Sequence, residues 1–408
     1  MTTFTLSKEE ISKLNSFISH GKDITSSSKY VFAPKDQTLI VAMMGNSFSV
    51  RLSLVISDYT TDKQSDELNY FVGDINNISS TASKVLNKSE SVKISIEEEA
   101  GVTRTRISNP ETSTNIALTN YTPISSSEAD EVIHAFENDL NSIFSGNKYV
   151  ITPDIEFMNV MSIICRSMKA SGNEVNSALV NKNEVKYCDP QGILTYTLDN
   201  NISPYEKDIY IQNTIIDYAK PFMKEGVTLT FEDSNSWVCI ESQAAGFVMV
   251  LGLESNKFQY PTEDEASYVS PETGSMTSIQ VNREQLMEGL KTFDGVFRSE
   301  LWRWSNIELD SSSGYLSSNQ VLLSHSDYNA EASTIIPVQV VENTDATTDN
   351  YKFLIGSSYL NDILNLITDE NVVISYTSGE IGEPHGTGYI VEGSKIKVIC
   401  VKIQKADA

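Results

Sequence analysis

The sequence predicts an α+β protein made of three copies of one unit, each with two amphipathic helices packed against antiparallel strands. Two observations support this. A short apolar run, a helix-start signal and an amphipathic helix occur in that order three times, and each copy is followed by a second helix and a β-rich segment. Because the order recurs at similar spacing, we expect three domains, at residues 1–125, 126–275 and 276–408.

The first helix of each unit is expected to start at a polar cap. Ser7 with Glu10, and Asn282 with Gln285, have the spacing of a capping box, and Thr152 stands at the same place in the second unit. Apolar residues then recur on one helical face: Ile11, Leu14, Phe17 and Ile18; Phe157, Val160, Met161 and Ile164; and Leu286, Leu290 and Phe293.

The second half of each unit also repeats. An apolar run, a helix and a strand-like segment occupy residues 70–96, 209–231 and 353–376, and segments of strand character lie between the two helices of each unit. Residues 109–127 and 254–275 are interpreted as connectors because they are rich in polar residues and proline. Residues 128–144 predict a helix capped by Ser127, either an additional one between the first two units or the first helix of the second unit with shifted boundaries.

Composition limits the class of protein. The 408 residues carry a net charge of −25, which favours solubility and argues against a simple basic DNA-binding surface. No run of about 18 apolar residues suggests a membrane span, and the N-terminus lacks a secretory pattern, so we expect a cytoplasmic protein. The four cysteines are far apart and form no CxxC pair, which is typical of buried free thiols.

Motifs of common enzymes are missing from the sequence. It has no GxxxxGK[ST], GxGxxG, HExxH or GxSxG pattern, so we expect no catalytic residue, cofactor or metal site. His385 lies in a Gly- and Pro-rich stretch that fits either an active-site loop or a hairpin turn, and we favour the turn. The acidic run at residues 97–99 is likewise expected at a hairpin tip rather than at a cation site.

Four stretches resemble the sliding clamp family, of the bacterial DNA polymerase III β-subunit type. Residues 282–290 (NREQLMEGL) are similar to the start of the family's last domain, and residues 356–364 (GSSYLNDIL) to its NPKYLLDVL stretch. Residues 397–402 (KVICVK) fall where the family ends in a VVMPMRL strand, and residues 257–261 (KFQYP) resemble the linker before the last domain. As an order of elements the resemblance spans the chain; as residues it is clear from about Asn282 onward.

The resemblance implies a non-enzymatic processivity factor. Six domains close the family's rings, so three per chain imply a homodimer joined at sheet edges of its first and third domains. Such a ring encircles double-stranded DNA, is placed there by a clamp loader, and tethers the replicative DNA polymerase. The chain is longer than typical members and divergent, which suggests that it is encoded by a phage and acts in the host cytoplasm.

The resemblance also implies two kinds of site. Helices line the pore in the family, and the cations of the corresponding segments are Lys8, Lys13, Lys84, Lys88, Arg166, Lys169, Lys220, Lys224, Arg283, Lys291 and Arg298. The same cations also fit ordinary solvated helix faces. The family's partner-peptide pocket corresponds to Phe258, Tyr260, Pro261, Val398, Ile399, Cys400 and Val401. Residues 398–401 alternatively fit an ordinary buried strand.

Three other functions remain compatible with the residues. The Ser-, Thr- and Asn-rich β segments fit a virion structural or assembly protein. A clamp-like scaffold could bind partners without encircling DNA. A metal-dependent hydrolase would need carboxylates that converge in space, which a sequence does not display.

Overall fold

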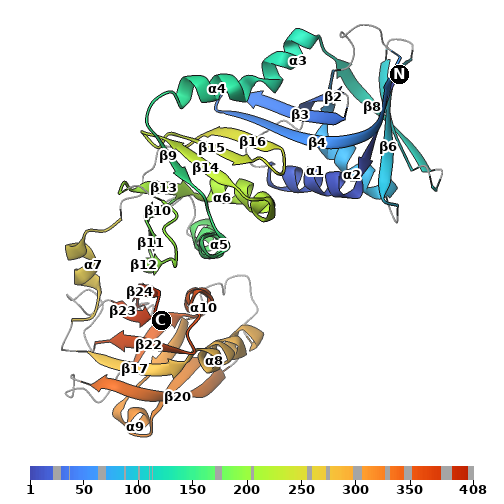
Figure 1. Ribbon diagram of the computed structural model, residues 1–408. Coiled ribbons are helices and arrows are strands. Elements are labelled where there is room, and N and C mark those ends of the chain that lie inside the picture. The colour runs from blue at the N-terminus through green and yellow to red at the C-terminus, as the bar shows by residue number, and fades with distance from the viewer. Residues whose placement is uncertain are drawn as a thin grey trace. The chain divides into compact units, whose positions relative to one another are not determined.

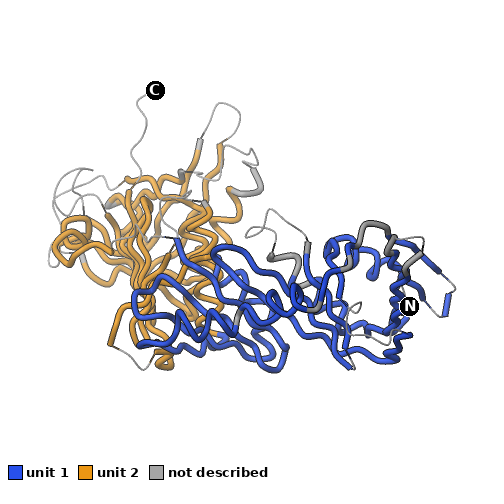
Figure 2. The backbone as a smooth tube through the Cα atoms, turned by 90° about the horizontal axis from the view of Figure 1, so that it is seen from above, with its two compact units in different colours: residues 1–155, 214–255 blue, residues 156–213, 256–408 orange. Residues whose placement is uncertain are grey.

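A computed structural model describes residues 1–21, 29–35, 37–62, 70–86, 89–99, 102–109, 111–112, 114–170, 177–203, 206–254, 260–272, 276–296, 306–326, 331–343, 352–377 and 388–402. The chain divides into two compact units (Figure 2). One comprises Met1–Ile155 and Thr214–Ser255, and the other Glu156–Asn213 and Asn256–Ala408. Each contains one twelve-stranded sheet whose pairings are antiparallel. The α+β class is therefore confirmed.

The elements recur in the predicted order of helix, strands, helix and strands (Figure 1). The structure places one strand before the first helix of a repeat, four between the two helices and three after the second. The first repeat consists of β1 (Thr2–Ser7), α1 (Lys8–Gly21), β2 (Lys29–Lys35), β3 (Thr38–Gly45), β4 (Phe48–Thr61), β5 (Phe71–Asp74), α2 (Ile75–Leu86), β6 (Ser91–Glu99), β7 (Val102–Asn109) and β8 (Thr114–Pro123). The second consists of β9 (Lys148–Ile151), α5 (Ile155–Ala170), β10 (Ser177–Asn181), β11 (Glu184–Asp189), β12 (Gly192–Thr197), β13 (Ile209–Gln212), α6 (Asn213–Ala219) with a 3₁₀ turn (Lys220–Glu225), β14 (Thr228–Glu232), β15 (Trp237–Ser242) and β16 (Phe247–Gly252).

The third repeat has an additional short helix between its second and third strands. It consists of β17 (Thr277–Asn282), α8 (Arg283–Val296), β18 (Asn306–Asp310), α9 (Ser313–Leu316), β19 (Gln320–Ser326), β20 (Glu331–Asn343), β21 (Lys352–Gly356), α10 (Ser357–Leu366), β22 (Asn371–Tyr376), β23 (Gly388–Glu392) and β24 (Ile396–Val401). Further helices lie between the repeats: α3 (Ser126–Ile133), α4 (Ala135–Ile143) and α7 (Glu263–Val269).

The helix caps follow the sequence signals at two of the three starts. The Ser7 hydroxyl accepts a hydrogen bond from the Glu10 amide at 3.3 Å, and the Asn282 side chain accepts one from the Gln285 amide at 3.1 Å. The helix expected at Thr152 begins three residues later, as α5. The two helices of a repeat pack together where both belong to one compact unit: α1 contacts α2, and α8 contacts α10.

The expected first connector is wrong, and the helix expected after it differs in its break and its cap. Residues 109–127 are not a loop, because β8 occupies most of them and pairs with β7. Its Thr- and Asn-rich composition reflects a strand with one open edge, where polar side chains face water. The helix expected at residues 128–144 is two helices that meet at His134, and its cap is Ser125, not Ser127.

The sheet of each unit continues from one repeat into the next. In the first, the order is β1-β6-β7-β8-β5-β2-β3-β4-β16-β15-β14-β9, and β1 also pairs with β4, which closes the strands of the first repeat on themselves. In the second, the order is β13-β10-β11-β12-β24-β23-β22-β17-β20-β19-β18-β21. The repeats are thus joined by the pairings β4·β16 and β12·β24, which we call the first and second junctions.

Candidate functional site

The two junctions have the same hydrogen-bond register. Five residue pairs join the strands in each case, and flanking bonds match as well. The Gly252 amide donates to the Ser47 carbonyl at 2.7 Å in the first junction, and the Val401 amide donates to the Gln191 carbonyl at 2.8 Å in the second. Position 250 therefore corresponds to position 399, and position 49 to position 193.

The last strand of the second junction presents alternate residues to opposite faces. Val398 and Cys400 are fully buried, so a peptide in solution has no access to them. Ile399 and Val401 are half-buried on the other face, where Ile193 of β12 is the direct partner of Ile399. The predicted pocket residues of β24 therefore divide into two core residues and two candidates for partner contact.

Tyr260 and two residues of the second repeat extend this face. The Tyr260 hydroxyl is 3.0 Å from the Thr195 hydroxyl, and the Lys186 ammonium lies 5.8 Å from the centre of the Tyr260 ring. Lys186, Thr195 and Lys397 are direct cross-strand partners in neighbouring strands, so they form a polar row beside the apolar pair Ile193 and Ile399. Burial raises the pKa of Tyr260. We call the surface formed by Tyr260, Ile193, Thr195, Ile399 and Val401 the junction face.

Helix α7 lies against β24 at the edge of this surface. A side chain at Gly388 of β23 would meet the Val269 carbonyl at 2.4 Å, so glycine allows the end of α7 to lie close to the strand. None of the residues of α7 is buried, and Tyr268 is half exposed. Helix α7 therefore borders the junction face without contributing buried side chains to it.

Glycine is also required at Gly192, where β12 begins to pair with β24. A side chain at Gly192 would lie 2.5 Å from the Ile399 carbonyl and 2.9 Å from the Tyr359 hydroxyl. The adjacent Asp189 carboxylate holds the β11–β12 turn, because it accepts hydrogen bonds from the Gln191 and Gly192 amides at 2.8 and 3.1 Å. Burial raises the pKa of Asp189.

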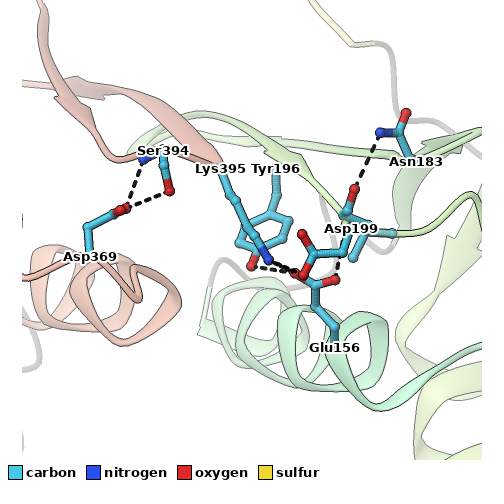
Figure 3. A network of polar contacts seen from close by, with 8 residues as sticks. Glu156, Asn183, Tyr196, Asp199, Asp369, Ser394 and Lys395 are labelled. Carbon is cyan, nitrogen blue, oxygen red and sulfur yellow. Dashed lines mark hydrogen bonds and ion pairs between the residues drawn. The ribbon is translucent and has the colours of Figure 1, made fainter.

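A polar network fixes the other end of the second junction (Figure 3). Lys395, just before β24, forms ion pairs with Glu156 of α5, at 2.8 Å, and with Asp199 after β12. The same Glu156 carboxylate accepts hydrogen bonds from the Tyr196 hydroxyl at 3.1 Å and from the Asp199 amide at 2.9 Å. Burial and the Glu156 charge raise the pKa of Tyr196 to about 12, and the Asp199 and Glu156 carboxylates raise the pKa of Lys395.

The turn that carries Lys395 is held from its own repeat too. The Asp369 carboxylate accepts hydrogen bonds from the Ser394 amide at 2.8 Å and from the Ser394 hydroxyl at 3.0 Å (Figure 3). These bonds lower the pKa of Asp369. The start of β24 is therefore fixed both to its own repeat and to the neighbouring one.

The predicted pore cations occupy several environments. Lys8, Lys84, Arg166, Lys169, Lys220, Lys224 and Lys291 have exposed side chains. Lys13 pairs with Glu10 at 2.8 Å within α1, and Arg283, at the start of α8, donates to the Ile367 carbonyl at the end of α10 at 2.6 Å. Arg166 lies 3.7 Å from Asp362. Lys88 and Arg298 lie outside the described residues.

Of the predicted pocket, the structure brings Tyr260, Pro261, Ile399 and Val401 to the junction face or its border, whereas Phe258 lies outside the described residues. Ile193, Thr195 and Lys186 were not predicted from the sequence. The signal that could have revealed them is the repeat itself, since β12 occupies the position of β4. His385 also lies outside the described residues, and the acidic run at residues 97–99 ends the first strand of the β6–β7 hairpin, as expected.

Two searches within the described part of the chain gave no candidates. No group of three or more His, Cys, Asp or Glu side chains there could hold a metal ion. None of the helices described is long and apolar enough to cross a membrane.

Comparison with known proteins identifies the fold. No known family profile and no curated protein sequence matches the chain. Solved structures do match: DNA polymerase III β subunits from Thermotoga maritima (TM-score 0.67, 14% identity, 100% of both chains) and from Borrelia burgdorferi (TM-score 0.70, 13% identity, 99% and 100%). The β clamp of Helicobacter pylori, bound to a DNA ligase peptide, matches with TM-score 0.66 and 12% identity over 99% and 100%. The chain therefore has the bacterial β-clamp fold over its whole length.

Proposed function

We propose that the protein is a DNA polymerase processivity factor, a sliding clamp without catalytic activity. The observation that carries this proposal is the full-length likeness to β clamps combined with two junctions of identical register. A closed ring is retained on duplex DNA by topology, so the acidic net charge is compatible with encirclement. We propose further that the chain is phage-encoded, acts in the host cytoplasm, and is placed on DNA by a clamp loader.

The junctions indicate which edges would close the ring. Each joins the fourth strand of one repeat to the last strand of the next, which leaves β20 and β8 as the unused equivalents. Among the described residues, 331–337 of β20 and 114–121 of β8 are paired on one side only. Ile335 is 52% exposed at this edge. We propose that β20 of one protomer pairs with β8 of the other in a homodimer of six domains.

Native mass spectrometry over a range of concentrations tests ring closure. The wild-type chain should be a dimer, and Ile335→Asp should shift it to monomer because the new charge would lie in the closed sheet. Val341→Asp is the matched control, since Val341 is 56% exposed on the same strand but in the half that β17 already pairs. A dimer that persists in Ile335→Asp would contradict this interface, and a wild-type trimer would contradict the ring.

Retention on DNA tests encirclement directly. A ring loaded on nicked circular duplex should remain through a salt wash and leave when the circle is cut, because only topology holds it. We propose that the exposed cations of the pore helices, such as Lys84, Lys220 and Lys291, supply weak phosphate contacts. Reversing their charge should weaken loading and make it depend less steeply on salt, because fewer counterions are released from phosphate. Equal loss from circular and linear DNA would favour a scaffold that does not encircle DNA, and large assemblies would favour a virion protein.

We propose that the junction face binds short partner peptides with apolar anchors, including those of the replicative polymerase. The support is its mix of half-buried Ile399 and Val401 with the polar groups of Tyr260 and Thr195. The DNA ligase peptide of the Helicobacter pylori complex, made fluorescent, is a suitable probe. Ile399→Asp should abolish binding, whereas Val55→Asp, at a 66% exposed position of β4, should not. Equal binding by both variants would remove the proposed site.

A further inference from the structure

The first junction is covered by a helix, whereas helix α7 only borders the junction face of the second. Helices α3 and α4 lie between β8 and β9, in the first compact unit (Figure 1). Ala129 and Ile133 of α3 pack on β2 and β3. Helix α4 and the residue after it, Phe144, then pack on β15 and β16, and α4 also contacts β4. The α4 segment therefore spans the strands of the first junction.

The covered surface corresponds position by position to the junction face. Phe144, with Leu140 and Ile143, packs on Cys239, Val248 and Val250. By the shared register, Val250 and Val248 occupy the positions of Ile399 and Lys397. Val250 is fully buried beneath α4, whereas Ile399 is only half-buried. The difference in exposure thus comes from the covering helix.

Polar contacts on the neighbouring strand fix the position of the helix. Ser49 of β4, at the position of Ile193, donates its hydroxyl hydrogen bond to the Asp139 carboxylate of α4. Arg51, at the position of Thr195, lies 3.8 Å from the Glu137 carboxylate. Helix α4 therefore contacts both strands of the first junction, with apolar residues on β16 and acidic residues on β4.

We infer that the first junction is a second docking surface, occupied in cis by α4. The surface takes an amphipathic helix with apolar residues at positions i, i+3 and i+4 and acidic residues at positions i−3 and i−1. The parallel with the junction face rests on the proposed function, but the occupancy by α4 does not. A chain whose α4 is displaced therefore exposes a surface that accepts the same helix from a separate molecule.

The test adds this helix back as a peptide. The probe is a fluorescent peptide of residues 135–147, measured by anisotropy against three forms of the full chain. Leu140→Asp/Phe144→Asp displaces the helix, because two charges would enter an apolar contact. Asn138→Asp/Asn141→Asp adds the same charges to the exposed side of α4 and is the matched control. Amide hydrogen exchange of residues 135–144 reports displacement independently.

The displaced chain should bind the peptide at least tenfold more tightly than either the wild-type chain or the control. Adding Ile399→Asp to the displaced chain should leave that binding unchanged, which separates this surface from the junction face. If the charged variant does not fold, Leu140→Ala/Phe144→Ala replaces it. If hydrogen exchange shows that α4 is displaced but no peptide binds, the inference is overturned. It is also overturned if the α4 amides stay protected in both displaced variants.

Discussion

The two junctions use the same backbone bonds, but different side chains complete them. The first is sealed by α4, and the residues flanking β16 are Gly246 and Leu253. The second is open on its junction face, and the corresponding positions around β24 are Lys395 and Lys402. Lys395 forms ion pairs at the surface, and Lys402 is buried. One junction is thus stabilised mainly by apolar contacts, and the other by charge and hydrogen bonding at its borders.

Backbone pairing alone does not decide whether a strand junction has a face open to a partner. The register is common to both, so the function of each depends on what covers its outer face. A junction with an apolar cover has no area left for a peptide. A junction that is stabilised by polar contacts at the ends of its strands leaves the outer face between them accessible.

Removing the apolar contact between the α4 segment and β16 should have the largest effect on stability. Phe144→Ala should lower the free energy of unfolding by about 3–4 kcal/mol, because it empties a site where the aromatic ring is only 6% exposed. Urea denaturation measures this loss. Tyr268→Ala, on α7 beside the second junction, should change stability by less than about 0.5 kcal/mol, since Tyr268 is half exposed. Similar losses of unfolding free energy in both variants would show that apolar packing of a helix does not stabilise the first junction more than the second.

A bulky side chain at Gly192, where β12 begins to pair with β24, should have the next largest effect on stability. Gly192→Val should cost about 2–3 kcal/mol, because the new side chain meets the Ile399 carbonyl. Gly146→Val is the control, since no atom lies within 4 Å of a side chain added there. The same denaturation experiment distinguishes them. A Gly192→Val variant that is as stable as the wild type and still binds peptide would mean that β12 and β24 can move apart there without loss of stability.

The buried lysine should make the second junction respond to pH. Burial lowers the pKa of Lys402 from 10.5 to about 8, although its ammonium donates to the Thr377 carbonyl at 2.9 Å. Between pH 8 and 10.5 the unfolded chain therefore binds a proton that the folded chain does not, so wild-type stability rises with pH there. Lys402→Leu, which installs the first junction's residue type, should be about 1 kcal/mol more stable at pH 7.

That advantage of Lys402→Leu should shrink as the pH is raised from 8 to 10. Unfolding free energies of both proteins at pH 7, 8, 9 and 10 measure it. A constant difference across this range would show that the lysine keeps its proton when the protein folds.

Loss of the surface ion pairs should have the smallest effect. Lys395→Met should lower the unfolding midpoint slightly at low salt, and the difference from wild type should shrink toward 1 M salt, because the pair with Asp199 is exposed and screened whereas the pair with Glu156 is partly buried. Lys182→Met is a suitable comparison, because Lys182 forms one exposed pair, with Glu206, away from both junctions. A loss in Lys395→Met that is independent of salt would mean that Lys395 acts through packing instead.

The repeat order and two helix caps could be predicted because they depend on local signals. Ser7 and Asn282 cap their helices through side chains three residues from their partners, a distance that a sequence displays directly. β8 was missed because a strand with an open edge needs few apolar residues, so its composition resembles a loop. The β24 part of the candidate site was found by resemblance, but Ile193 and Thr195 come from a strand about 200 residues earlier, and only the fold brings them together.

The position of α4 in the chain also has a consequence for synthesis on the ribosome. Helix α4 ends at Ile143, but β16, the strand on which it packs, begins at Phe247. At typical elongation rates the interval is on the order of ten seconds. Throughout it, Leu140, Ile143 and Phe144 lack their apolar partners, and the edge of β4 at residues 48–52 lacks its neighbour. The segment that α4 covers in the folded protein therefore stays exposed in the nascent chain until β16 has been synthesised.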